Sequence, residues 1–214
     1  MGESAATLLP KRPRSLPRGR HNLSRADVES DQRLRILLAF APAMAETGYV
    51  DTPVAAIIRS AGVSRETYYR LFTDKLDGFL SALDLVGEVL LAELTSALDG
   101  SGDPLDRVEA AFGHYLGLLA EHRPEARLFL VETSAAGPEA IERRARMHDR
   151  LAAELADALG TSSDEGRFSC LTIVAAISSM IAAPLVNGDM ALIEGMATRM
   201  SDHLRRSYAA GLLD

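Results

Sequence analysis

Apolar positions recur along this chain every three or four residues, which is the spacing of one face of an α-helix. The stretch from residue 74 to residue 99 is a clear case, with Leu76, Leu80, Leu83 and Leu90 at nearly regular helical intervals. Glycine and proline separate such stretches, as expected for helix boundaries. No convincing run alternates β-branched and polar residues, so the pattern predicts an all-α protein.

The same periodicity gives approximate bounds for each helix. Helices are expected over residues 24–47, 52–61, 64–73, 74–99, 104–121, from Pro124 onward, 137–160, 164–186 and 190–210. Two of these helices contain an interior proline, Pro42 and Pro184. Because proline lacks a backbone N–H and costs an interior helix about 3 kcal/mol, we expect a kink or an end near each.

Residues 52–75 predict two short helices joined by a tight turn. Val54, Ile57 and Ile58 supply an apolar face to the first helix, and Gly62 in the turn tolerates a left-handed conformation. Ser64 suits the N-cap of the second helix. A helical hairpin in any all-α protein has these features, but so does the helix-turn-helix of DNA-binding proteins. The Arg- and Tyr-rich exposed side of the second helix favours DNA binding.

The spacing of particular residues in this region resembles the signature of TetR-type transcriptional regulators. The matching positions are Thr52, Val54, Ile57, Ala61-Gly62-Val63-Ser64, Thr67, Tyr69, Phe72 and Lys75. The match is detailed over residues 24–80, and the remainder is similar in helical character and length. The resemblance implies a flexible basic arm over residues 1–23, a three-helix DNA-binding head over 24–73, and a helical-bundle body over 74–214 for ligand binding and dimerisation.

The resemblance also implies which side chains contact a palindromic, double-stranded operator. The expected DNA-binding residues are Arg18, Arg20, Thr52, Ser64, Arg65, Glu66, Thr67, Tyr69, Arg70 and Lys75. Arg65 is the main candidate for a base contact, because arginine can donate to both O6 and N7 of guanine. Thr67, Tyr69 and Lys75 are expected at phosphates. Thr52 is expected to cap the helix over 52–61 and also to donate to a phosphate. Glu66 either accepts from cytosine N4 or only favours the helix N-terminus.

The charge of the chain is unevenly distributed. A net charge of −7 argues against general affinity for nucleic acid, yet residues 1–80 hold 12 Lys and Arg against 9 Asp and Glu. Residues 81–214 hold 11 against 21. This asymmetry predicts a basic head on an acidic body. Five of the basic residues lie in the Pro-containing arm, which is either a solvated tail or a segment that follows phosphates or enters the minor groove.

The body offers candidates for a dimer interface and a ligand cavity. The helices expected over 164–186 and 190–210 are apolar on more than one side, so they form either an internal core or, as the family implies, a two-fold interface. A mainly apolar cavity for a small apolar ligand is expected, although each of its candidate residues also suits plain core. The candidates are Phe112, Tyr115, Leu119, Phe129, Met147, His148, Phe168 and Met180.

Other classes of protein are less well supported. The histidines lack metal-ligand spacing, no Gly-x-Ser-x-Gly or phosphate-binding loop is present, and Cys170 lies in an apolar stretch, so neither an enzyme nor a cofactor or metal is expected. The single cysteine fits the cytoplasm. No apolar stretch is expected to reach the length of a membrane span, and no membrane partner is predicted. A helical protein-interaction module remains the alternative to a DNA-binding regulator.

Overall fold

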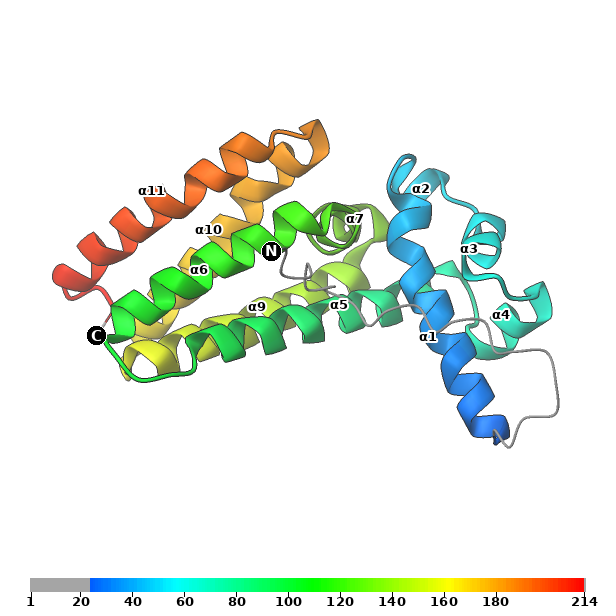
Figure 1. Ribbon diagram of the computed structural model, residues 1–214, viewed down its shortest axis with the longest axis horizontal. Helices are drawn as coiled ribbons and strands as arrows, with labels where there is room; N and C mark the ends of the chain where they lie inside the picture. Colours follow the sequence, from blue (N-terminus) through cyan, green and yellow to red (C-terminus); the bar gives the residue numbers. More distant parts are fainter. Residues whose placement is uncertain (1–23, 214) are drawn as a thin grey trace, which may run out of the picture.

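The computed structural model describes residues 24–213, and within that range it consists of helices with no strand (Figure 1). The predicted all-α class is therefore confirmed. A smaller head lies at one end of an elongated helical body. The head comprises α1 (Arg25–Met44), α2 (Gly48–Asp51), α3 (Val54–Ala61) and α4 (Arg65–Leu71).

The body is a bundle of long helices with three short segments where it meets the head. Its elements are α5 (Lys75–Leu98), α6 (Pro104–Glu121), α7 (Arg123–Arg127), the π-helical turn η1 (Leu128–Glu132), α8 (Thr133–Ala136), α9 (Pro138–Leu159), α10 (Asp164–Asn187) and α11 (Met190–Ala209). Helix α5 starts in the head and runs the length of the body beside α6 and α9, while α10 packs on α9 and α11 covers α6 and α10.

Local signals in the sequence explain most of the helix bounds. Ser24 and Asp27 form a reciprocal capping box at the start of α1, in which each side chain accepts from the other's backbone N–H. Helix α9 ends at left-handed Gly160, and α10 ends at left-handed Gly188. The predicted helix ends near the interior prolines are confirmed: Pro42 and Pro184 lie within the last turn of α1 and of α10, which end two and three residues later.

The head is built around aromatic side chains. Phe40 of α1, Tyr68 of α4, Phe72 after α4 and Phe79 of α5 are all buried, and Tyr68 and Phe72 have ring centroids 5.6 Å apart. Tyr68 also donates its hydroxyl to the Asp74 carbonyl at 3.1 Å. One aromatic core therefore fixes α4 to both α1 and the first turn of α5.

Two features of the body were not predicted. The segment after Pro124 is not one short helix but three pieces, α7, η1 and α8. The statement that no apolar stretch reaches membrane-span length is wrong, because α10 has 24 residues and an 18-residue window of mean hydropathy 2.0. Length and composition alone satisfy this criterion, and 44% of that window is buried inside the protein, as in the core helix of a bundle.

Two glycines on different helices should respond oppositely to alanine. A Cβ at Gly78 of α5 would lie 2.7 Å from Phe40 and from the Tyr68 hydroxyl, whereas a Cβ at Gly113 on the exposed side of α6 would meet nothing within 4 Å. We expect Gly78→Ala to lower the free energy of unfolding by about 1–3 kcal/mol through overpacking. Gly113→Ala, the control, should raise it by up to about 1 kcal/mol through helix propensity. Urea unfolding of both variants tests the packing, and a stabilised Gly78→Ala would contradict it.

Candidate nucleic-acid interface

The turn between α3 and α4 has the geometry that its sequence predicted. Gly62 adopts φ 64° and ψ 40°, its N–H donates to the Arg59 carbonyl, and the Val63 N–H donates to the Ile58 carbonyl. Ser64 caps α4 by accepting from the Thr67 N–H at 3.0 Å. The left-handed glycine and the cap together set the angle between the two helices.

The side chains on the buried side of α4 pack into the core of the head and hold the helix in place. Tyr68 is fully buried, and burial is the main reason that the pKa of its phenol is raised. Leu71 packs against the core from the same helix. The opposite side of α4 is therefore free to present its side chains to a partner.

That exposed side carries the main predicted base-reading residue. Arg65, Glu66 and Tyr69 are exposed, and the Arg65 guanidinium lies 5.4 Å from the Tyr69 ring centroid. Among the described residues, no carboxylate lies within ion-pairing distance of Arg65. Thr67 is half-buried and its hydroxyl lies 2.9 Å from the Ser64 hydroxyl. Arg65 thus keeps its donors available at the N-terminus of a rigidly held helix.

A groove of about 480 Å³ lies beside these side chains, between α3 and α4. Pro53, Val54, Ala55, Ile58 and Arg59 from the α3 side and Arg65 and Tyr69 from α4 line it. Arg59 was missed as a candidate, although its position in the last turn before Gly62 could have indicated it. The groove combines apolar surface with two exposed guanidinium groups, as a surface that contacts bases and phosphates requires.

Arg35 is a second residue whose role the sequence did not reveal. It lies in α1, is partly buried, and its Nε and Nη2 donate to the Ala61 carbonyl at 3.1 and 2.7 Å. Nη2 also donates to the Gly62 carbonyl at 2.5 Å. Arg35 therefore satisfies carbonyls at the end of α3 and ties the turn to α1.

Two predicted phosphate contacts have interior roles in this structure. Thr52 does not cap α3, whose N-cap is Pro53, and its buried hydroxyl donates to the Gly48 carbonyl at 2.6 Å. Lys75 does begin α5 as expected, but its ammonium donates to the carbonyls of Tyr49, Val50 and Thr52. As placed here, these two side chains stabilise the segment between α2 and α3.

Arg70 also has partners within the protein and contacts α1. Its guanidinium pairs with Glu29 at 3.2 Å and donates to the Gln32 side chain at 2.8 Å, both on α1. The predicted arm residues Arg18 and Arg20 lie outside the described residues. From residue 24 to residue 80 the chain holds seven basic and eight acidic residues, so the positive balance of the head comes from the arm.

The body contains a small cavity among four helices. Leu94 of α5, Phe112 and Tyr115 of α6, Leu151 of α9 and Val174, Ile177 and Ser178 of α10 line it. Its volume of about 20 Å³ suits a single water molecule. Burial raises the pKa of Tyr115 to about 12, and a hydrogen bond with Ser178 acts in the opposite direction. Ser178, a polar residue buried in an apolar helix, was the signal in the sequence that could have marked this place.

The predicted cavity residues separate into three groups. Phe112 and Tyr115 line the cavity, whereas Leu119, Phe129, Met147 and His148 are packed elsewhere in the body. Phe168 and Met180 do not line this cavity, because their side chains are 69% and 52% exposed on the outer side of α10. Phe168 instead lines a separate groove of about 250 Å³ beside α11, with His203 and Ser207. An all-round apolar helix gives no periodic signal that separates its inner from its outer side.

Solved structures share this arrangement of head and body. The fatty acid degradation regulator FadR from Bacillus halodurans superimposes with a TM-score of 0.69 at 17% identity, over 79% of this chain and 96% of that one. A TetR-like transcriptional regulator from Rhodococcus sp. RHA1 gives 0.64 at 20% identity, over 88% and 99%. The chain has the TetR-type fold. This confirms, at the level of the fold, the resemblance seen in the sequence.

A further structure with this fold contains a ligand. It is the transcriptional regulator FadR from Bacillus subtilis in complex with stearoyl-CoA, with a TM-score of 0.65 at 16% identity over 80% of this chain and 96% of that one. No protein-family model matches the sequence of this chain. No curated protein matches it either.

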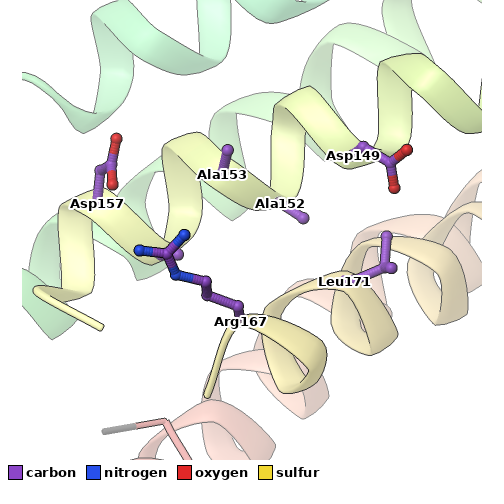
Figure 2. A pocket seen from close by; sticks show the side chains of 7 residues that line it. Asp149, Ala152, Ala153, Asp157, Arg167 and Leu171 are labelled. Carbon is purple, nitrogen blue, oxygen red and sulfur yellow. The ribbon is translucent and has the colours of Figure 1, made fainter. Parts of the chain in front are cut away.

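This TetR-type body also has a groove between α9 and α10, with a volume of about 190 Å³ (Figure 2). Ala152, Ala153 and Leu171 contribute its apolar surface, and Arg167 extends from α10 toward α9. Asp149 and Asp157 lie on α9 on either side of the alanines, with Asp157 at the Arg167 end of the groove and Asp149 at the Leu171 end. The groove thus has small apolar side chains at its centre and charges of both signs at its edges.

His148 gives a pH-dependent test of body packing in this TetR-type fold. Burial, reinforced by the charge of Arg144, lowers its pKa from 6.5 to about 4. Because the folded-state pKa lies below the unfolded one, His148 contributes stability that is present above about pH 6.5 and is lost as the pH falls toward 4. We expect the melting temperature of His148→Gln to fall less over this range than that of the wild type. The control His203→Gln alters an exposed histidine and should retain the wild-type loss. Equal acid sensitivity in wild type and His148→Gln would contradict this burial.

Proposed function

We propose that this chain is a sequence-specific DNA-binding transcriptional regulator of the TetR type. The observation that carries the proposal is the rigidly supported α4, with Arg65 and Tyr69 exposed beside the groove on α3. Two solved structures with this fold, the TetR-like regulator from Rhodococcus and FadR from Bacillus subtilis, are described as transcriptional regulators. In this proposal residues 1–23 are a DNA-contacting arm, 24–73 the DNA-binding domain and 74–214 the ligand-binding and dimerisation domain.

The proposed contacts divide into base reading and positioning. Arg65 reads a guanine in the major groove, while Ser64, Thr67 and Tyr69 donate to phosphates nearby. Arg59 joins them from α3, and Arg18 and Arg20 follow the DNA from the arm. Glu66 lies in the first turn of α4, where its negative charge interacts favourably with the positive end of the helix dipole. One head of this size gives modest affinity, so specific binding requires two heads on a palindromic operator.

The proposed homodimer forms through α10 and α11. From Phe168 to Asn187, α10 has no charged residue, and its exposed side includes Thr172, Ala175 and Ser179. Small exposed side chains allow a second helix to approach closely. Further large apolar side chains are exposed on these two helices and at the end of the chain, namely Met180, Val186, Leu192, Tyr208 and Leu212. Several large apolar side chains exposed on one pair of helices favour a protein–protein interface there.

We further propose that the regulator is a cytoplasmic repressor released by a small apolar ligand. The ligand would enter the cavity among α5, α6, α9 and α10, with Tyr115 and Ser178 as its polar partners. Because the cavity has room for only about one water molecule, ligand binding requires it to open. A ligand that favours an open body with displaced heads lowers operator affinity through a population shift.

DNA recognition is tested by selecting bound sequences from a random duplex pool at two salt concentrations. We expect a palindrome from the wild type. Arg65→Ala should lose about 1–3 kcal/mol of discrimination at one position per half-site, because the bidentate contact to guanine is removed. Arg146→Ala, which removes an exposed arginine of α9, should recover the wild-type sequence. Recovery of no sequence, or only of salt-sensitive unspecific binding, would support a protein-interaction module in place of a regulator.

Dimerisation is tested by placing a charge on the outer side of α10. Met180→Glu should weaken self-association at least about tenfold, because the interface would bury an unpaired carboxylate. Ile141→Glu is the matched control, since it replaces a large apolar residue that is also exposed, on α9. Sedimentation equilibrium measures both variants. A Met180→Glu protein that stays dimeric, or a wild type that is monomeric or associates only with lipid vesicles, would exclude this interface.

A further inference from the structure

A buried carboxylate of the body holds the backbone of the head. Glu132 is only 5% exposed, and its Oε2 accepts from the Tyr49 N–H of α2 at 2.7 Å. Its Oε1 accepts from Arg127 at 3.3 Å, so the buried charge is paired. Gly48 makes the approach possible, because it has φ +75° and a Cβ there would lie 3.0 Å from Oε2. The bond joins segments 83 residues apart in the chain.

The link continues from Tyr49 into the helix-turn-helix. The Tyr49 carbonyl accepts from Lys75 Nζ at 2.7 Å, and the same ammonium lies 4.3 Å from the centre of the Tyr49 ring. Lys75 also donates to the Thr52 carbonyl at 3.1 Å, directly before the N-cap of α3. The Tyr49 ring packs on Phe79 with centroids 4.9 Å apart. The position of α2 therefore determines where α3 begins relative to α5.

The element that carries Glu132 is also part of the body core. It is the last residue of η1, and π-helical turns are rare and frequently occur at functional sites. Phe129 of the same turn is buried, lies 3.3 Å from the place a Cβ of Gly87 would occupy, and has its ring 6.3 Å from that of His148. One turn of helix thus contacts the interior of the body with Phe129 and the backbone of the head with Glu132.

We propose that Glu132 is a positioning residue for DNA binding: by holding the Tyr49 amide, it sets the orientation of the head on the body. This inference rests on the proposed function for its effect on DNA. This gives η1 a definite role. If η1 changed from π- to α-helical geometry, the helix would shift by one residue, which rotates a side chain by about 100° around the helix axis. Such a turn would separate Glu132 from Tyr49. A rearrangement around Phe129 in the body would in this way reach α3.

The test compares three variants of the full chain. Glu132→Met keeps the side-chain length but removes the acceptor, and Glu132→Gln restores an acceptor. Glu154→Met is the matched control, since Glu154 accepts from Thr95 at 3.1 Å within the body and has no part in the head. Two measurements need no DNA: hydrogen exchange of the Tyr49 amide, and the distance distribution between spin labels placed at Glu66 in the head and Glu142 in the body. A third is the affinity for the selected operator.

We expect Glu132→Met to speed Tyr49 exchange at least about tenfold, because a buried amide loses its acceptor. The label distances should broaden, and operator affinity should fall at least about tenfold, with Glu132→Gln close to wild type in all three. Glu154→Met should leave Tyr49 exchange and label distances unchanged. Unaltered exchange and distances in Glu132→Met would overturn the proposal, as would a failure of Glu132→Gln to restore them.

The remaining outcomes are also decisive. If Glu132→Met does not fold, Gly48→Ala replaces it, because the added Cβ displaces the carboxylate at a backbone angle that disfavours alanine. Broadened distances in folded Gly48→Ala would support the positioning role, and wild-type distances would refute it. If the wild type selects no operator, the proposed function fails, while exchange and label distances still decide whether Glu132 orients the head.

Discussion

Backbone carbonyls at helix ends accept hydrogen bonds from several of the Arg and Lys side chains of this protein. The last carbonyls of a helix have no intrahelical donor, and burial without a partner is costly. Arg35 donates to the end of α3, and Arg107 donates to Leu98 at the end of α5 and to Ala158 near the end of α9. Lys75 does the same for α2, and Arg144 for Leu130 in η1. These bonds join different helices, so they fix the tertiary arrangement as well as the helix ends.

This use of cations changes how the charge of the head should be understood. A count of basic residues suggests a broadly positive DNA-binding surface, yet Arg35, Arg70 and Lys75 are bound within the protein. The exposed positive charge near α4 is concentrated at Arg59 and Arg65. A head of this kind depends for specificity on a few well-placed contacts, and for general affinity on the arm and on a second head.

The sequence predicted the features that depend on neighbouring residues. The turn at Gly62 and the cap at Ser64 follow from local backbone chemistry, and the long helices follow from their periodicity. Side-chain partners across the fold were not predictable in this way. The positions of Arg70 and Lys75 suit exposed phosphate contacts, but the acceptors that they meet come from α1 and α2, whose placement only tertiary packing sets. Nor does a π-helical turn such as η1 have a pattern that distinguishes it from an α-helix.

The glycines of α6 have a consequence for the cavity beside it. Gly113, and Gly117 one turn later, both face open space, so α6 lacks side chains there that would stiffen it, and each glycine lowers helix propensity by about 1 kcal/mol relative to alanine. Two residues that line the cavity are close to these glycines: Phe112 directly precedes Gly113, and Tyr115 lies between Gly113 and Gly117. Helix α6 is therefore held straight by its neighbours more than by its own sequence. Bending α6 at these two positions therefore costs less than it would with alanine there, and any such bend would move Phe112 and Tyr115 at the cavity wall.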